Sequence, residues 1–152
     1  MKLDNKLFSD KVLIFHQDLK TKDEVFEDLN KKLLAKGVVN NEFLDAVKKR
    51  EMKFPTGLQI ESGFGVAIPH TDPQFVHEDQ IGFMSLNNSI QFRQLGSETD
   101  KVQVKMIFIL CLKEAHKQLD MLQNLMTLFG DSNQIEQLYK CKSPDEFLKI
   151  IC

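Results

Sequence analysis

The residues best suited to chemistry in this sequence lie in the stretch GVAIPHTDP, residues 65–73. An apolar run leads there directly into Pro69 and His70, after which the chain becomes polar. The residue before a proline is driven toward extended geometry and the proline ring fixes its own φ, so the pair would hold the His70 imidazole in one place. A neutral imidazole is a nucleophile near neutral pH. The stretch predicts a rigidly held, reactive histidine at the end of a buried strand.

The residues after His70 favour an anion beside the imidazole. Thr71 or Asp72 is suited to capping a helix or turn with Pro73 near its start, and free backbone N–H groups at such a start attract negative charge. A rigid imidazole beside free amides is a suitable place to hold a phosphoryl group. The alternative is a hydrogen-bonded structural histidine, the commoner role of a single histidine at a strand end.

Two further polar residues are candidates, although their spacing does not show whether they approach His70. Arg50 stands at the end of an amphipathic helix just before the FPTG loop, and His116 lies in the first turn of a long helix that follows a central strand. Each alone would be a surface residue. A metal site from His70 and His77 is disfavoured by the proline-containing turn between them. Cys111, within an apolar run, is most simply a core residue.

The elements that would position these residues alternate between helix and strand. Thr21 and Glu24 have capping-box spacing, and Gly37 closes the same helix. Strands are predicted at 11–15, 66–68, 80–86, 89–92 and 101–112, and helices at 21–37, 40–53, 114–129, 132–141 and 143–152. In the helix at 114–129, the predicted apolar face consists of Leu119, Leu122, Met126 and Phe129. The pattern predicts an α/β fold, a three-layer sandwich with a mixed β-sheet flanked by helices on both faces.

Composition narrows the class of protein further. The 152 residues suit a single domain spanning 1–152, and the net charge of −2 argues against nucleic-acid binding. Three cysteines without a CxxC pair argue against a disulfide framework or a zinc site. Neither a signal peptide nor a membrane-spanning run is evident, and neither a dinucleotide fingerprint nor a phosphate-binding P-loop is present, so we expect a cytoplasmic protein without metal or cofactor.

Four segments together resemble a known family: REMKFPTG, GVAIPHTD, IGFMSL followed by IQF, and VKMIFILCLKEAHKQLDMLQNLMTLF. They resemble the type 2 (fructose/mannitol) EIIA component of the phosphoenolpyruvate-dependent sugar phosphotransferase system, closest to its galactitol-like branch. The resemblance implies a mixed sheet between helices, which agrees with the element pattern. One departure is Phe64, six residues before His70, where mannitol-type members often carry an acidic residue.

The resemblance also implies a cytoplasmic phosphotransferase without cofactor. His70 would accept a phosphoryl group from the phosphohistidine of HPr and pass it to a cysteine of a separate EIIB chain, which phosphorylates the sugar entering through the membrane permease EIIC. Arg50 and His116 would stabilise the phosphoryl group. Two alternatives are a regulatory protein of the same fold, controlled by phosphorylation of His70, and a hydrolase or metal enzyme using His70 and His116, which would be active without HPr.

Overall fold

The computed structural model describes residues 2–152, in which five strands form one mixed sheet. The strands are β1 (Leu13–Gln17), β2 (Gly57–Gln59), β3 (Gly65–Ala67), β4 (Gln80–Arg93) and β5 (Lys101–Cys111). Their order across the sheet is β1-β4-β5-β3-β2. The β1–β4 and β3–β5 pairs are parallel, whereas β4–β5 and β2–β3 are antiparallel. The prediction of a mixed sheet is therefore confirmed.

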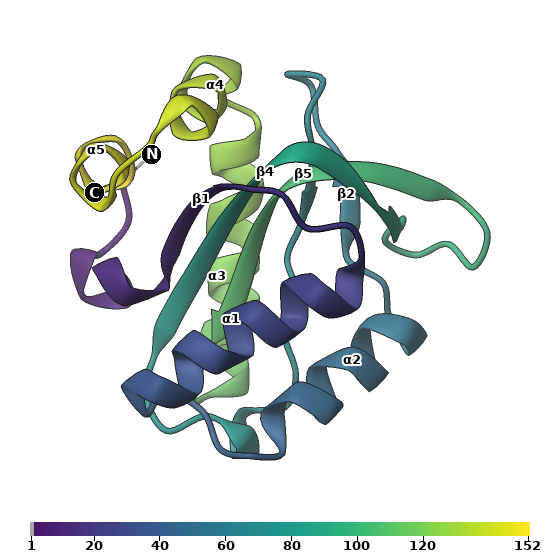
Figure 1. Cartoon of the computed structure of the whole chain (residues 1–152), viewed down its shortest axis with the longest axis vertical. Helices are drawn as coiled ribbons and strands as arrows, with labels where there is room; N and C mark the ends of the chain where they lie inside the picture. Colours follow the sequence, from purple (N-terminus) through teal and green to yellow (C-terminus); the bar gives the residue numbers. More distant parts are fainter. Residues whose placement is uncertain (1) are drawn as a thin grey trace.

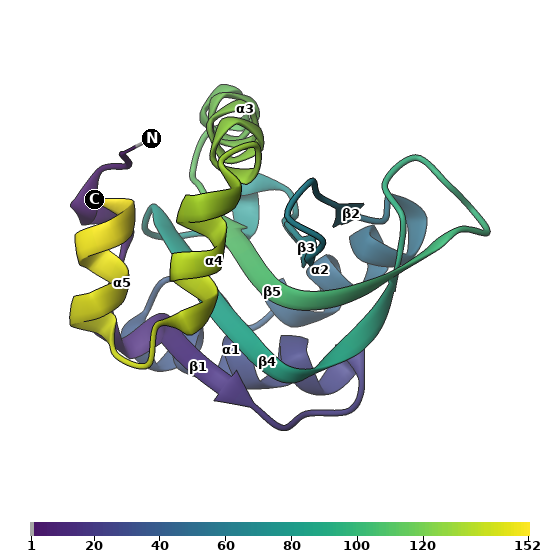
Figure 2. The same ribbon diagram turned by 90° about the horizontal axis from the view of Figure 1, so that it is seen from above.

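Helices cover both faces of this sheet, so the predicted three-layer sandwich is also confirmed. The helices are α1 (Lys22–Lys36), α2 (Phe43–Lys53), α3 (Ala115–Phe129), α4 (Ser132–Lys140) and α5 (Pro144–Ile151). Short 3-10 helices occupy Asn5–Leu7, Asp10–Val12 and Pro73–Phe75. Figure 1 shows α1 and α2 in front of the strands and α3 behind them, and Figure 2 shows the same layers from above. Among residues 2–152, no helix combines the length and hydropathy that crossing a membrane requires.

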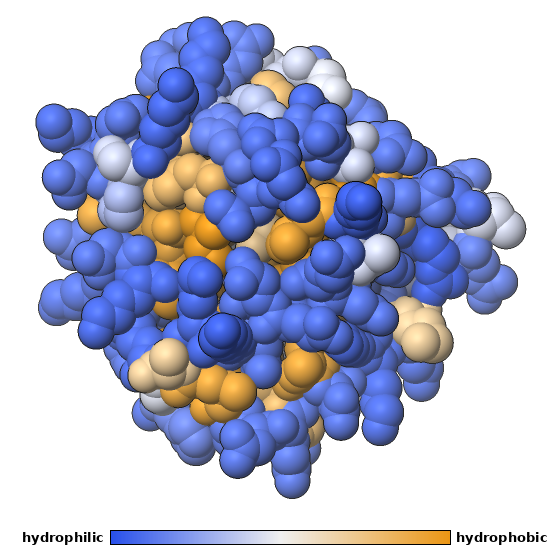
Figure 3. Space-filling model, viewed as in Figure 1, coloured by the Kyte–Doolittle hydropathy of each residue, from blue (hydrophilic) through white to orange (hydrophobic). Residues whose placement is uncertain are grey.

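Each face of the sheet has its own apolar core. Side chains of α1 and α2 pack on one face, and side chains of α3, α4 and α5 pack on the other. The strands supply both cores because successive side chains point to opposite faces. In β5, for example, Ile107 and Ile109 belong to the first core, while Met106 and Phe108 belong to the second. Outside these cores, the face that carries α1 and α2 is mostly hydrophilic, with small separate apolar patches (Figure 3).

The local sequence signals at the helix ends are borne out. The Thr21 side chain accepts the Glu24 N–H, and Gly37 ends α1 in the left-handed conformation at φ 78°. Ser143 caps α5 by accepting the Glu146 N–H, with Pro144 at the first helical position. These short-range contacts fix where the helices begin and end before any tertiary packing is considered.

Two predictions about element detail are wrong. The strands expected at 80–86 and 89–92 form one strand, β4, which bulges where its pairing with β5 shifts between Ser85 and Ile90. In α3, Leu119 and Met126 of the predicted apolar face are 59% and 48% exposed. The buried residues of α3 are Met121, Leu125, Leu128 and Phe129. The helix is apolar on more than one side, and the position of the sheet decides which side is buried.

The order of the strands brings two segments that are distant in the sequence to the same end of the sheet. Strands β3 and β5 are parallel neighbours, so the carboxyl ends of both strands lie at the same end of the sheet. His70 follows β3, and α3, which carries His116, follows β5. The Leu110 N–H donates to the Pro69 carbonyl at 2.9 Å, so contact between the two segments continues to the residue before His70.

We predict that Gly65→Ala lowers the free energy of unfolding by roughly 1–3 kcal/mol, the usual range for overpacking a core. A Cβ at Gly65, the first residue of β3, would overlap the backbone carbonyl of Gln103 in β5. Urea unfolding would measure the change. Gly130→Ala is the control, because this residue has helical dihedral angles and a Cβ there meets its nearest atom at 3.4 Å. Equal midpoints for the two variants would contradict the close approach of β3 to β5.

Candidate functional site

His70 is held by a hydrogen bond to the chain just before it. Its Nδ1 atom lies 2.9 Å from the carbonyl oxygen of Ile68. Because a carbonyl oxygen can only accept, Nδ1 must carry the proton in this contact. In the neutral ring the lone pair is then on Nε2. The half-buried imidazole therefore has its nucleophilic nitrogen at the end of the ring away from Ile68.

The surroundings favour the neutral form of this imidazole. Burial lowers the pKa of His70 most, and the positive charge of Arg50 lowers it further. The hydrogen bond to Ile68 and the negative charge of Asp72 act in the opposite direction, but the net effect is a pKa below the ordinary value. A histidine in this setting is uncharged at neutral pH and so has a lone pair available for nucleophilic attack.

Arg50 supplies a positive charge close to the histidine segment. It lies in the last turn of α2, and its Nη1 is 3.7 Å from Oδ1 of Asp72, two residues after His70. The guanidinium also lies over the Phe54 ring, 5.1 Å from the ring centre. The side chain is 37% exposed, and the contact of Nη1 with Asp72 is long. Arg50 therefore retains donor capacity for an incoming anion.

A shallow groove of about 270 Å³ lies between α2 and the segment that follows His70. Three cationic side chains and one carboxylate contribute to its wall. The lining residues are Ala46, Lys49, Arg50, Lys53, Phe54, Thr71, Asp72 and Phe75. The excess of positive charge suits the binding of an anionic group or an acidic protein surface.

The turn after His70 differs from the sequence prediction. Asp72 does stand at the N-cap position, but the 3-10 helix that follows spans only Pro73–Phe75. Three residues generate little helix dipole, and the Asp72 carboxylate faces Arg50. Positive charge near His70 therefore comes from the Arg50 side chain of α2 and not from a helix N-terminus.

A buried network that we did not predict connects α2 to the histidine segment. Both oxygens of the Glu51 carboxylate accept from Thr56, one from the backbone N–H at 2.7 Å and one from the hydroxyl at 2.8 Å. The Thr56 hydroxyl oxygen accepts the Ile68 N–H at 3.2 Å. Glu51 and Thr56 both lie in the segment REMKFPTG, which we singled out for its resemblance to the EIIA family without assigning a role to either residue.

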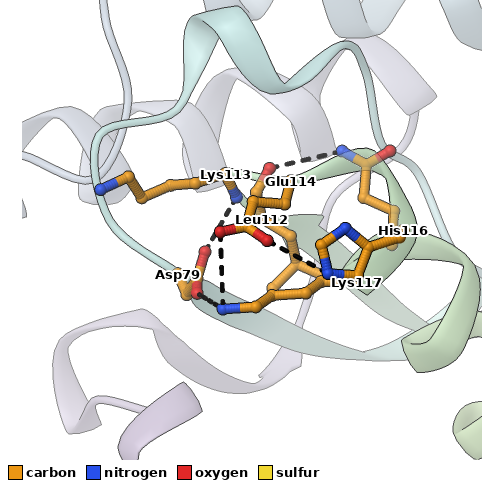
Figure 4. Close-up of polar contacts among 7 residues, drawn as sticks. Asp79, Leu112, Lys113, Glu114, His116 and Lys117 are labelled. Carbon is orange, nitrogen blue, oxygen red and sulfur yellow. Dashed lines mark hydrogen bonds and ion pairs between the residues drawn. The ribbon is translucent and has the colours of Figure 1, made fainter.

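The start of α3 contacts the chain just after His70 through Gln118. The Gln118 side-chain amide donates to the Thr71 carbonyl at 2.9 Å. His116 is largely exposed, and its Nε2 lies 3.1 Å from a carboxylate oxygen of Glu114. Figure 4 shows Glu114 between His116 and Lys117, with Lys117 also reaching toward Asp79. In the part of the chain described here, His116 thus pairs with Glu114 and not with His70.

The other candidate residues lie in ordinary structural settings. His77 is exposed, and Cys111 is fully buried in the apolar core, as predicted. The Phe64 ring packs 4.9 Å from the Tyr139 ring of α4, so the departure noted in the sequence supports packing at that position. No group of three or more histidine, cysteine, aspartate or glutamate side chains among residues 2–152 is arranged to hold a metal ion.

Comparison with known proteins shows the family to which this chain belongs. Residues 6–152 match the family described as "Phosphoenolpyruvate-dependent sugar phosphotransferase system, EIIA 2". The chain therefore belongs to this EIIA family, as its sequence motifs predicted.

Individual relatives and solved structures are similar to the chain. The chain is similar to the galactitol-specific EIIA component of Escherichia coli K12, with 31% identity over 74% of this chain and 72% of the relative. Among solved structures, it resembles the IIA chain in the complex of enzyme IIA-mtl with phosphorylated enzyme IIB-mtl from E. coli, with a TM-score of 0.73, 21% identity and coverage of 95% and 97%. The nitrogen regulatory protein IIA-Ntr from Neisseria meningitidis gives a TM-score of 0.73, 21% identity and coverage of 97% and 98%.

We predict that the pKa of His70 lies below the ordinary histidine value of about 6.5. Arg50→Gln should raise this pKa because it removes a nearby positive charge, and Asp72→Asn should lower it because it removes a negative one. An NMR titration of the imidazole would measure each value, with Lys140→Gln on α4 as the control. A wild-type pKa above the ordinary value would contradict this account of the site, as would a lower pKa in Arg50→Gln or a higher pKa in Asp72→Asn.

Proposed function

We propose that this chain is a cytoplasmic phosphocarrier in which Nε2 of His70 accepts a phosphoryl group from phosphorylated HPr. His70 then passes the group to a cysteine of a separate EIIB chain, which serves the uptake of a sugar or sugar alcohol through the membrane permease EIIC. The observation that carries the proposal is the hydrogen bond from Nδ1 to the Ile68 carbonyl, because it leaves the lone pair on the outward nitrogen. The likeness to a galactitol-specific component supports a sugar alcohol.

The two transfers balance without any cofactor. In the first, the Nε2 lone pair forms a bond to phosphorus as the N–P bond on the HPr histidine breaks. In the second, the EIIB cysteine thiolate forms an S–P bond as the N–P bond on His70 breaks, which returns the lone pair to Nε2. The proton stays on Nδ1, hydrogen-bonded to the Ile68 carbonyl, throughout both steps, so the ring needs no proton transfer.

The cationic groove supports this chemistry. Charge builds on the equatorial oxygens of a transferring phosphoryl group, so catalysis is mainly positioning and electrostatic stabilisation. The partly exposed guanidinium of Arg50 makes only a long contact to Asp72, so it can turn to the phosphoryl oxygens. His116 would reach the group only by leaving Glu114. The likeness to an EIIA that forms a complex with phosphorylated EIIB supports EIIB as a partner.

We predict that His70→Ala abolishes phosphorylation and that His77→Ala has no effect. The protein would be mixed with phosphoenolpyruvate, Enzyme I and HPr, and its intact mass measured. The wild type should gain one acid-labile phosphoryl group, whereas the His70 variant should gain none. Full phosphorylation of that variant, or an equal defect in the His77 variant, would contradict the assignment of the site.

Arg50→Ala should slow phosphorylation by roughly 10- to 100-fold, because it removes charge-assisted hydrogen bonds to the phosphoryl oxygens. His116→Ala should slow it by only roughly 2- to 10-fold, the range for one ordinary hydrogen bond. Quenched-flow measurements with phosphorylated HPr would give both rates, with His77→Ala as the control. Wild-type rates in both variants would show that neither residue stabilises the phosphoryl group.

A regulatory role is the second candidate, because the same fold occurs in a protein named as a nitrogen regulator. In that case phosphorylation of His70 would control the binding of a partner protein. Phosphorylated protein that delivers no phosphoryl group to any EIIB encoded by the same genome would favour the regulatory role over transport.

A further inference from the structure

We propose that Glu51 and Thr56 are positioning residues for His70, acting through a hydrogen-bond relay that ends at the Ile68 carbonyl. The relay runs from the buried carboxylate through the threonine hydroxyl to the Ile68 backbone. It thereby sets which imidazole nitrogen carries the proton. The inference rests on the proposed phosphocarrier function and extends it to two residues that do not touch the phosphoryl group.

The first link of the relay anchors the loop after α2. Glu51 and Thr56 are each only 3% exposed. The carboxylate accepts two short hydrogen bonds from Thr56, one on each oxygen, so the loop between the two residues is closed tightly. Because Glu51 is next to Arg50, the same contact fixes the last turn of α2, from which Arg50 extends.

The second link has only one possible polarity. The Thr56 hydroxyl has a single hydrogen, which it gives to Glu51, so its oxygen faces the Ile68 N–H with a lone pair. The order of donation is Ile68 N–H to Thr56, and Thr56 O–H to Glu51. The two bonds fall on different carboxylate oxygens, and a glutamine at position 51 would replace one of these acceptors with an NH2 donor, so it could not accept at both positions.

The third link replaces a missing backbone contact. The β2–β3 pairing ends at Gly57 with Ala67, so Thr56 and Ile68 come directly after its last pair. There the threonine side chain, not its backbone, binds Ile68. On the other side, Leu110 of β5 donates to Pro69. Residues 68 and 69 are therefore held by hydrogen bonds from the segments on both sides. As a result, the Ile68 carbonyl points in a fixed direction toward Nδ1 of His70.

The energetics of Glu51 favour a role beyond packing. Burial raises the pKa of its carboxyl group, although the hydrogen bonds from Thr56 oppose that effect. A carboxylate is an expensive group to place in a protein interior, and an apolar residue could fill the same space without that desolvation. What an apolar residue could not do is accept two hydrogen bonds and orient Thr56 toward Ile68.

The test compares Thr56→Val, which removes the hydroxyl at nearly constant volume, with Thr56→Ser, which keeps it. Glu51→Gln tests the other end of the relay, and Glu61→Gln, at an exposed position in the β2–β3 turn, is its matched control. Circular dichroism and thermal unfolding establish that each variant is folded. The first readout is the 15N NMR spectrum of the unphosphorylated imidazole, which reports which nitrogen of His70 is protonated.

We expect the wild type, Thr56→Ser and Glu61→Gln to show the form protonated on Nδ1. Thr56→Val and Glu51→Gln should show a mixture of the two neutral forms. The maximal rate of phosphorylation by HPr should fall roughly 10- to 100-fold in those two variants, as misplacement of a reacting group does. The KM for HPr should change little, because the outer surface is unaltered.

Folded Thr56→Val or Glu51→Gln protein with the wild-type protonated form and rate would overturn the proposal. If neither variant folds, the residues are structural only and the proposal also fails. A wild-type protein that HPr does not phosphorylate would instead refute the proposed function. In that case the NMR comparison still decides whether the relay orients His70.

Discussion

The hydrogen bond between Nδ1 of His70 and the Ile68 carbonyl is the contact around which the site is organised. An isolated imidazole exchanges its proton between two nitrogens and has no preferred reactive end. A single carbonyl acceptor removes that ambiguity, provided that the carbonyl itself cannot move. Much of the surrounding structure serves this condition, since Pro69 removes a backbone torsion and Leu110 holds the proline carbonyl.

The shortness of β3 explains why side chains are needed at this point. The strand has three residues, Gly65–Ala67, and its paired section ends before Ile68. A longer strand would have held Ile68 through backbone hydrogen bonds, but it would also have continued the pleat past residue 68 and left no room for the turn that carries His70. The Thr56 hydroxyl oxygen accepts one hydrogen bond from Ile68 in place of a backbone bond between strands. The Glu51 carboxylate then accepts from the backbone N–H of Thr56, which would otherwise lack a partner. The polar network and the short strand are therefore consequences of the same requirement.

Sequence reasoning succeeded where the physical cause is local. The Thr21 cap, the Gly37 helix end and the position of His70 after a buried strand all depend on residues a few places apart. It failed where the cause is tertiary. Leu119 and Met126 fit a helical apolar face as well as Met121 and Leu125 do, and only the position of the sheet selects between them. The link from Thr56 to Ile68 spans twelve positions of chain, so no local pattern contains it.

A protein that receives a group from one partner and delivers it to another, as we propose here, must leave the reactive face of its site open. Restraint on the nucleophile then has to come from the side that no partner touches. The arrangement around His70 has this character, because the supports from Glu51 and Thr56 are buried while Arg50 lines an open groove. The buried side of His70 is thus held rigidly, while the opposite side stays open to a partner. This division would let one surface serve both proposed partners, because the geometry of Nε2 is set from within and does not depend on which partner is bound.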